Sequence, residues 1–278
     1  MSKVWFVTGS SRGLGRGFVE AALSRGDRVA ATARNPEHLG GLVAAFGDAV
    51  LPLALDVTDP ASVDAGVGRA KEHFGRLDVV VNNAGYGLSG AVEELSDQEL
   101  RDQLETNLFG PLRVVRAVLP HLREQGGGHI VQVSSAAGVA AFPLGGGYCA
   151  SKWALEGLSE SLALEVAGFG VKVTLVEPGS YATDAIASAV HAQGHPLYDG
   201  LREAFAANVR TLDSGDPAAA ARALLKVVDA GDPPLRVFFG NENNQLVQQV
   251  YADRLQTWEE WQDLAFEAHG RTPSAPAA

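Results

Sequence analysis

A tyrosine and a lysine four residues apart form the pair in this chain best suited to proton transfer. Tyr148 and Lys152 would share one face of a helix, one turn from each other. Free tyrosine titrates near pH ~10 and is a poor acid or base at neutral pH. A cation about 4 Å away favours the phenolate by roughly 4 kcal/mol at an effective dielectric near 20, which is about three pKa units. The spacing therefore predicts a tyrosine that works as an acid or base near pH 7, although a half-buried aromatic beside a solvated charge has the same pattern.

The start of the chain has the order strand, glycine-rich turn, helix. The apolar run 4–7 precedes Gly9, Gly13 and Gly15, and a periodic segment follows from Phe18. Glycines let the backbone approach a pyrophosphate closely, and a helix N-terminus supplies N–H groups and a positive dipole end. The spacing Gly-x-x-x-Gly-x-Gly differs from the commoner Gly-x-Gly-x-x-Gly. A turn without a ligand is the other interpretation, but the flanking strand and helix favour nucleotide binding.

The end of the second predicted strand, 28–33, bears on the choice of cofactor. In dinucleotide folds an acidic residue roughly 20 positions past the glycines binds the ribose 2′-hydroxyl of NAD. Here Ala33 and Arg34 occupy that place. An arginine can hold a 2′-phosphate bidentately, and Arg12 in the glycine turn could reach the same phosphate. Two arginines that only face solvent would give the same sequence pattern. However, the absence of an acidic residue at this position, together with Arg12 and Arg34, favours NADP(H).

Further apolar runs alternate with helical segments along the chain. Strands are predicted at 50–56, 77–81, 130–133, 171–176 and 235–239. This alternation predicts an α/β fold, a doubly wound parallel sheet of about seven strands with helices on both faces. Ligands of such sheets bind beyond the carboxyl ends of the strands. The residues predicted at those ends are Gly9, Arg34, Asp56, Asn82, Ser135 and Pro178.

Three of the polar positions have two interpretations each. Asp56 could accept a hydrogen bond from an adenine amino group or be a structural loop carboxylate, and spacing does not separate the two. Asn82–Gly85 suits a cofactor edge or an ordinary turn. Asn107 lies within a long helical pattern at 97–125, where its low helix propensity is out of place unless it faces solvent.

These segments together resemble the short-chain dehydrogenase/reductase family over roughly residues 3–240. The matching elements are Thr8-Gly9-x-x-x-Gly13-x-Gly15, Asp56, Asn82-Asn83-Ala84-Gly85, Asn107, Ser135, Tyr148-x-x-x-Lys152 and Pro178-Gly179 with Thr183. The resemblance implies a Rossmann-type single domain and NADP preference through Arg12 and Arg34. It assigns catalysis to Asn107, Ser135, Tyr148 and Lys152. The cofactor-binding residues that it implies are Gly9, Ser11, Arg12, Gly13, Leu14, Arg34, Asp56, Val57, Asn83, Ala84, Gly85, Tyr148, Lys152, Pro178, Gly179 and Thr183.

The activity that the resemblance implies is hydride transfer between NADP(H) and a carbonyl or secondary alcohol. Tyr148 would exchange the proton, Lys152 would lower the tyrosine pKa and hold the nicotinamide ribose, and Asn107 would position a water. A non-catalytic NADP-binding sensor or regulator is the alternative, and the intact acid–base set counts against it. The places of five residues in the chain predict a substrate pocket that suits an apolar or aromatic ketone or alcohol. These residues are Val139, Phe142, Leu144, Tyr181 and Ile186.

Composition excludes several other classes of protein. The chain has 278 residues and a net charge of −11, which counts against general binding to nucleic acid or anionic membranes. Cys149 is the only cysteine, so no intrachain disulfide is possible, and a reducing, cytoplasmic location is expected. There is no signal-peptide pattern and no apolar run of the ~18 residues that cross a bilayer. His191 and His195 have no further ligands nearby in sequence, so no metal is expected.

The chain is expected to form one domain over 1–271. A lid is predicted at 180–215, where 184–215 shows no clear strand. An appended helix at 245–267 is expected to cover the sheet edge or a partner subunit. This long helix puts a tetramer in doubt and is compatible with a homodimer. The tail 272–278 is expected to be disordered.

Overall fold

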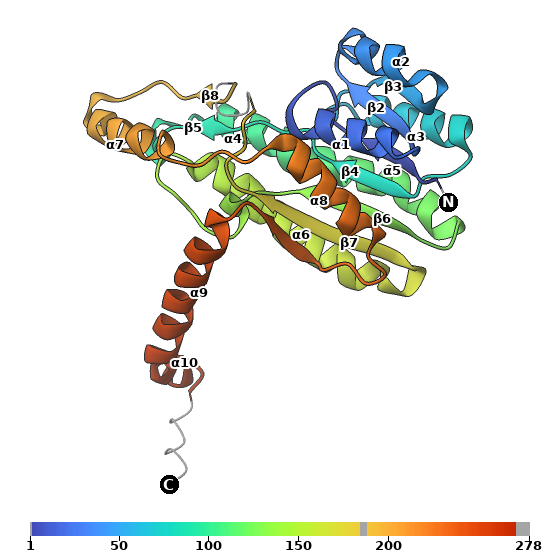
Figure 1. Cartoon of the computed structure of the whole chain (residues 1–278). Coiled ribbons are helices and arrows are strands. Elements are labelled where there is room, and N and C mark those ends of the chain that lie inside the picture. Colours follow the sequence, from blue (N-terminus) through green and yellow to red (C-terminus); the bar gives the residue numbers. More distant parts are fainter. Residues whose placement is uncertain (1, 184–187, 271–278) are drawn as a thin grey trace.

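Seven parallel strands form one sheet in the order β3-β2-β1-β4-β6-β7-β9 (Figure 1). The computed structural model describes residues 2–183 and 188–270, with only the backbone at position 242. The strands are β1 (Val4–Val7), β2 (Arg28–Ala33), β3 (Val50–Ala54), β4 (Val79–Asn82), β6 (Gly128–Val133), β7 (Val171–Pro178) and β9 (Arg236–Phe239). The predicted doubly wound sheet is confirmed, with each strand within a few residues of its expected place.

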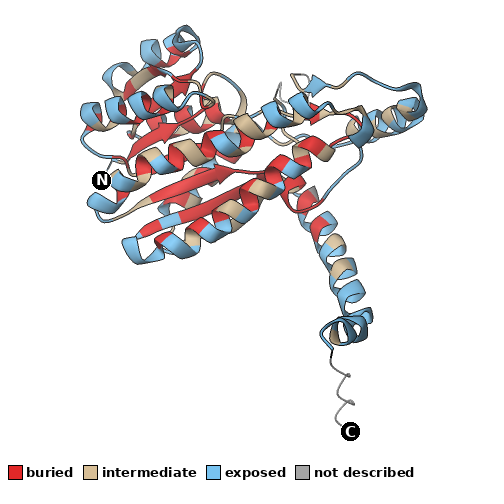
Figure 2. Cartoon of the chain, turned by 180° about the vertical axis from the view of Figure 1, so that it is seen from behind, coloured by how far each residue is buried: buried red, intermediate tan, exposed pale blue. Residues whose placement is uncertain are grey.

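Helices cover both faces of the sheet. The helices are α1 (Gly13–Ser24), α2 (Gly40–Phe46), α3 (Pro60–Phe74), α5 (Gly110–Glu124), α6 (Gly146–Val166) and α8 (Pro217–Asp229). Trp5 and Val7 of β1 belong to the core on the side of α1, α2 and α8, while Val4 and Phe6 face α3, α5 and α6. All four are fully buried, which is why β1 is apolar at every position (Figure 2).

Local signals set the helix ends. The side chain of Asp59 accepts a hydrogen bond from the N–H of Ala61 and caps α3, and Pro60 takes the first helical position. Gly75, at φ +77°, ends the same helix in the left-handed conformation. Asp216 and Pro217 repeat the N-terminal arrangement at α8. Capping thus fixes where the helices that flank the sheet begin.

The long helix expected at 97–125 is divided into three parts. A π turn, Glu105–Phe109, separates α4 (Asp97–Leu104) from α5. A π turn inserts one residue into the helical repeat and so changes the direction in which the neighbouring side chains point. Asn107 lies inside this turn and is buried. The interpretation of Asn107 as a solvated side chain was therefore wrong.

The predicted lid contains regular structure. A two-residue strand, β8 (Val190–His191), pairs in parallel with β5 (Leu88–Ser89), and helix α7 (Asp199–Val209) follows. The carboxylate of Glu94 accepts hydrogen bonds from Arg202 Nη1 and from the backbone N–H of His195, both at 2.6 Å. The expectation that 184–215 lacks a strand was wrong, because Val190–His191 is one. Glu94 and β5 bind the described part of this segment, 188–215, to the segment that follows β4.

The appended helix is two helices, α9 (Glu242–Glu260) and α10 (Gln262–Ala268), which meet at Trp261. Both project away from the sheet (Figures 1 and 2). The base of α9 packs against the body through Val247, which joins Val139 in a small buried cluster. The helix therefore does not cover the sheet edge. No helix within the described ranges has the length and apolar character to cross a membrane; the tail 272–278 lies outside those ranges.

Candidate active site

The parallel sheet places its carboxyl strand ends at a single edge. Because β1, β2, β3, β4, β6 and β7 run in the same direction, the residues that follow them lie along that edge. The residues at these ends are Thr8, Gly9, Arg34, Asp56, Asn83, Ser135 and Pro178. The edge expected to hold a cofactor is therefore a real feature of the fold.

The glycine turn after β1 is braced by the segment after β4. The amide Nδ2 of Asn83 donates to the carbonyl oxygens of Thr8 and Gly9, each at 3.0 Å. The hydroxyl of Thr8 accepts from the N–H groups of Asn83 (2.9 Å) and Ala84 (3.0 Å). These bonds give Asn83 a structural role. Thr8 stood in the recognised motif, but its role as a brace was not predicted.

The turn has the shape of a phosphate cradle. Gly9 has φ +68°, and a Cβ there would lie 2.9 Å from the Cα of Ala84. Gly13 has φ +57°, and a Cβ there would lie 3.7 Å from the side chain of Thr183. The N-terminus of α1 has no side-chain cap and no acidic residue in its first turn. These features fit a pyrophosphate bound by backbone N–H groups. Ser11 is half-buried in the same turn, and Leu14 packs against the core.

The part of the sheet edge expected to bind the adenosine of the cofactor carries charges of both signs. Arg12 and Arg34 are exposed. Partial burial works to raise the pKa of the Asp56 carboxyl, but hydrogen bonds from Thr58 and the charge of Arg34 bring it below its ordinary value. The bonds from Thr58 N and Oγ1, at 2.9 and 2.8 Å, both end on Oδ1. Asp56 is thus a loop carboxylate that organises the turn after β3. Val57 beside it is buried.

Ser135 and Tyr148 are brought together from two elements. Ser135 Oγ accepts from the N–H of Ala137 at 3.1 Å and lies 3.5 Å from the carbonyl oxygen of Pro178. Tyr148 is in the first turn of α6, which begins at Gly146, two residues before the expected start. Burial raises the pKa of Tyr148 above 10, and a hydrogen bond with Ser135 works to lower it. A serine and a phenol that share a hydrogen bond can both contact one substrate oxygen.

Lys152 is buried in the same helix but does not act on Tyr148 as expected. Its Nζ donates to the carbonyl oxygen of Val133 at 2.8 Å and lies 5.8 Å from the centroid of the tyrosine ring. Burial lowers the lysine pKa to about 8, although the charge of Glu156 works to raise it. The prediction of a lowered tyrosine pKa was wrong for the protein in this state, because burial outweighs every other influence on the phenol.

Asn107 meets the loop after β4. Its Oδ1 accepts from the N–H of Tyr86 at 3.1 Å, and its Nδ2 donates to the Tyr86 carbonyl at 3.0 Å. A second Nδ2 bond reaches Ser151 Oγ at 3.1 Å. Gly85 passes so close that a Cβ there would lie 3.0 Å from Asn107 Oδ1. Sequence reasoning missed Tyr86 and Ser151, because no periodicity or motif signals their contact with Asn107.

The residues proposed for the substrate pocket are only partly brought together. Phe142 stacks on Phe205 of the lid helix α7, with ring centroids 5.8 Å apart. Leu144, in the same loop before α6, has the unusual φ of +62°, a strained value for a side chain with a Cβ. These two lie on the loop that leads to Tyr148. Phe205 was not predicted as a pocket residue. The signal that could have found it is its aromatic side chain within 180–215, the segment predicted as a lid.

The other three pocket candidates lie elsewhere. Val139 packs against α9. The ring of Tyr181 lies against Gly215 and joins the core near α8. Ile186 falls outside the described residues. At the end of β7, the N–H of Gly179 donates to the Phe239 carbonyl at 2.8 Å. Among residues 2–183 and 188–270 no three His, Cys, Asp or Glu side chains gather as metal ligands.

Comparison with known proteins decides the family. The sequence model described as short chain dehydrogenase matches residues 3–194. The chain belongs to this family. The oxidoreductase BOA17 of Botryotinia fuckeliana (strain B05.10) is 43% identical to this short-chain dehydrogenase over an alignment of 271 residues, and the match covers 95% of this chain and 98% of the relative. The short-chain dehydrogenase is therefore an oxidoreductase.

Solved structures agree with the assignment. A short-chain dehydrogenase from Streptomyces avermitilis is 40% identical, with a TM-score of 0.91, and the match covers 96% of this chain and 98% of that one. An alcohol dehydrogenase from the archaeon Thermococcus sibiricus, complexed with 5-hydroxy-NADP, is 29% identical with a TM-score of 0.72, over 86% and 96%. The Rossmann-type fold of this short-chain dehydrogenase is shared with both.

Proposed function

We propose that this short-chain dehydrogenase transfers a hydride between NADP(H) and a carbonyl or secondary alcohol, with Tyr148 as general acid and base. The observation that carries the proposal is the Tyr148 phenol, hydrogen-bonded with Ser135 and one helical turn from the buried Lys152. This group lies at the sheet edge that also bears the glycine turn. Family membership and a solved relative in complex with a modified NADP support a nicotinamide cofactor.

Each polar residue has a distinct part in the proposed reaction. When bound, the nicotinamide supplies or accepts the hydride. Ser135 Oγ and the Tyr148 phenol donate hydrogen bonds to the substrate oxygen, and Tyr148 gives its proton to the forming alkoxide. Lys152, whose pKa of about 8 keeps it mostly protonated at pH 7, holds the nicotinamide ribose. Asn107 is assigned the positioning of a water that returns protons through Lys152.

The proposed preference for NADP rests on charge. Arg34 follows β2 at the position where NAD-binding folds have an acidic residue, and Arg12 lies at the N-terminus of α1. Both are exposed and could close on a 2′-phosphate. The rest of the proposed cofactor site is the glycine turn with Asp56 and Val57, the 83–85 segment, and Pro178, Gly179 and Thr183.

The proposed substrate is a small apolar or aromatic ketone or alcohol. The stacked Phe142 and Phe205 and the buried Leu144 would form the apolar wall beside Tyr148. We also propose that residues 1–271 act as one domain and that the chain works in the cytoplasm, where a lone buried Cys149 stays reduced. A homodimer is the favoured assembly, because Trp258 and Leu255 on the projecting α9 are more than half exposed.

The proposal is tested by following NADPH absorbance with a panel of apolar and aromatic ketones. We expect turnover of at least one ketone, with NADH a poorer donor at equal concentration. Tight binding of NADPH with no turnover across the panel would instead support the alternative of a non-catalytic NADP-binding sensor.

A further inference from the structure

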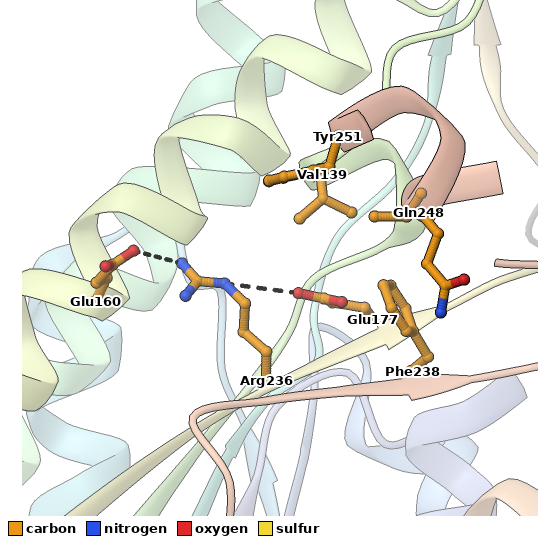
Figure 3. A pocket seen from close by; sticks show the side chains of 8 residues that line it. Val139, Glu160, Glu177, Arg236, Phe238, Gln248 and Tyr251 are labelled. Atoms are coloured by element: carbon orange, nitrogen blue, oxygen red, sulfur yellow. Dashed lines mark hydrogen bonds and ion pairs between the residues drawn. The ribbon is translucent and has the colours of Figure 1, made fainter. Parts of the chain in front are cut away.

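A pocket distinct from the cofactor edge lies between α6, β7, β9 and the base of α9 (Figure 3). Its volume is about 470 Å³. Apolar and aromatic side chains form one part of the wall, and Glu160, Glu177 and Arg236 form the other. Glu160 comes twelve residues after Tyr148 on α6, which places it about 18 Å along the helix axis from the tyrosine. This end of the pocket is therefore remote from Tyr148, while Glu177, at its other end, directly precedes Pro178 of the proposed cofactor site.

The hydrogen bonds of Arg236 leave two buried carboxylate oxygens without a donor among the described residues, Oε1 of Glu156 and Oε1 of Glu177, and of these two residues only Glu177 lines the pocket. The Nε of Arg236 donates to Glu156 Oε2 at 2.9 Å, and its Nη2 donates to Glu160 Oε2 at 2.7 Å. Glu177 Oε1 lies 3.7 Å from the same Nε, too far for a hydrogen bond, and Nε carries a single hydrogen. The Glu177 side chain is only 1% exposed, yet no donor among the described residues reaches Oε1. A buried carboxylate oxygen without a donor is costly, so a ligand that donates a hydrogen bond to Oε1 would stabilise it.

The charge around the pocket is negative. Two carboxyl groups, Glu160 and Glu177, face the single guanidinium of Arg236, and Glu156 lies behind it. Burial raises the pKa of Glu177 to about 7, and the nearby charge of Glu156 adds to this, while Arg236 works to lower it. On α9, Arg254 lies over the ring of Trp153, 4.8 Å from its centroid, and donates to the carbonyl of Val139. It is thus engaged away from Glu177.

The wall opposite the charges is apolar. Val139 and Phe238 belong to the buried cluster at the base of α9, and Tyr251 adds an aromatic ring. Such a wall would strip water from a small inorganic cation without replacing it, which is unfavourable. The same surface suits a hydrocarbon or aromatic body, and the tyrosine ring adds attraction for a positive charge.

We propose that this pocket binds an organic cation, a protonated amine on an apolar body, with the ammonium on Glu177 Oε1 and the body against Val139 and Phe238. An anion of the same shape would face uncompensated carboxylates. A neutral alcohol could donate one hydrogen bond to Glu177 but would add no positive charge to that of Arg236, which already forms an ion pair with Glu177 at 3.7 Å. The site is independent of the proposed hydride transfer, so either inference can fail without the other.

Calorimetric titration of the full chain at a pH above 7 tests the proposal. The ligands are 2-phenylethylammonium, with 2-phenylethanol as the neutral match and 3-phenylpropionate as the anionic match. We expect one site for the ammonium, binding at least about tenfold weaker for the alcohol, and none for the carboxylate. Glu177→Gln should weaken ammonium binding at least about tenfold, while Glu165→Gln, an equal change of charge at an exposed site on α6, should leave it within about twofold.

A second variant guards against misfolding of Glu177→Gln. Gln248 lines the pocket and is exposed, so Gln248→Lys places a positive charge at the pocket without disturbing the buried cluster. It too should weaken ammonium binding at least about tenfold. The proposal is overturned by absent ammonium binding, by equal binding of ammonium and alcohol, by unchanged binding in Gln248→Lys, or by displacement of the ammonium by NADPH.

Discussion

Asn107 Nδ2 donates a hydrogen bond to Ser151 Oγ, 3.1 Å away, and the same hydroxyl donates to the backbone carbonyl of Tyr148 at 2.7 Å. The π turn is thereby connected through one serine to the turn of α6 that carries the proposed acid. Asn107 therefore has a positioning role toward Tyr148 that is separate from any contact with water.

Replacement of Asn107 by alanine should lower both stability and turnover. It removes three hydrogen bonds, one buried and two partly buried, which link Asn107 to Tyr86 and Ser151. We expect the free energy of unfolding to fall by roughly 2–4 kcal/mol, measured by urea denaturation, and kcat to fall with it. Asn208→Ala, at an exposed position of α7, is the control. Equal stability of the two variants would contradict this role.

Replacement of Gly9 by alanine tests the phosphate cradle, and replacement of Gly26 is its matched control. Both have positive φ, +68° and +92°, but a Cβ at Gly9 would lie 2.9 Å from Ala84 Cα, whereas one at Gly26 meets nothing within 4 Å. Gly26→Ala should cost about 1–2 kcal/mol of stability from backbone strain alone. Gly9→Ala should cost more and weaken NADPH binding at least about tenfold, measured by fluorescence titration. If both variants bound NADPH like the unchanged protein, the cradle would be misplaced.

Arg34 should determine the choice of cofactor. Arg34→Ser removes charge-assisted hydrogen bonds to a 2′-phosphate, each of about 1.5–3 kcal/mol, so KM for NADPH should rise about tenfold or more. KM for NADH should not change. Arg69→Ser, at an exposed position of α3, removes an equal charge elsewhere. Initial rates with both cofactors provide the measurement, and an equal rise in KM for NADPH and NADH would refute this role of Arg34.

His129 should make the fold less stable in mild acid. Its Nε2 lies 3.0 Å from Thr174 Oγ1, and burial, followed by the charges of Lys172 and Lys3, lowers its pKa from 6.5 to about 4. Between these values the unfolded chain binds a proton that the folded chain does not. The free energy of unfolding should therefore fall as pH falls from 6.5 to about 4, by up to about 3 kcal/mol from this group.

The His129 contribution is isolated by comparison with a variant. Glu177, with its raised pKa, works in the opposite direction over part of the same range. Because both proteins contain Glu177, the difference between the unchanged protein and His129→Gln cancels its effect. Denaturation at several pH values should show a shallower loss in the variant. Parallel pH curves would show that His129 titrates normally in the fold.

The sequence was sufficient to predict the sheet and the edge at which the candidate site residues lie. Seven apolar runs were separated by helical segments, and a parallel sheet then had to bring the residues after Val7, Ala33 and Val133 to one edge. Family likeness supplied the proposed catalytic set, which strand periodicity alone would not have identified.

The features that were not predicted from the sequence depend on contacts between segments that are far apart in the chain. The leucine spacing of 97–125 continues through the π turn, so the extra residue left no signal. The direction of the Tyr148 pKa shift depends on burial, which only the packed structure reveals. Amphipathic character at 245–267 indicated a helix but not what covers it, and α9 projects outward instead.

The proposed hydride transfer depends most directly on the phenol of Tyr148. Tyr148→Phe keeps the ring and removes only the oxygen, so NADPH should bind within about twofold of the unchanged protein. Turnover of a ketone should fall at least about a hundredfold, as expected for loss of a general acid. Tyr251→Phe, a tyrosine on α9 that is 43% exposed, is the control and should keep full activity. Near-normal turnover by Tyr148→Phe would contradict the central claim.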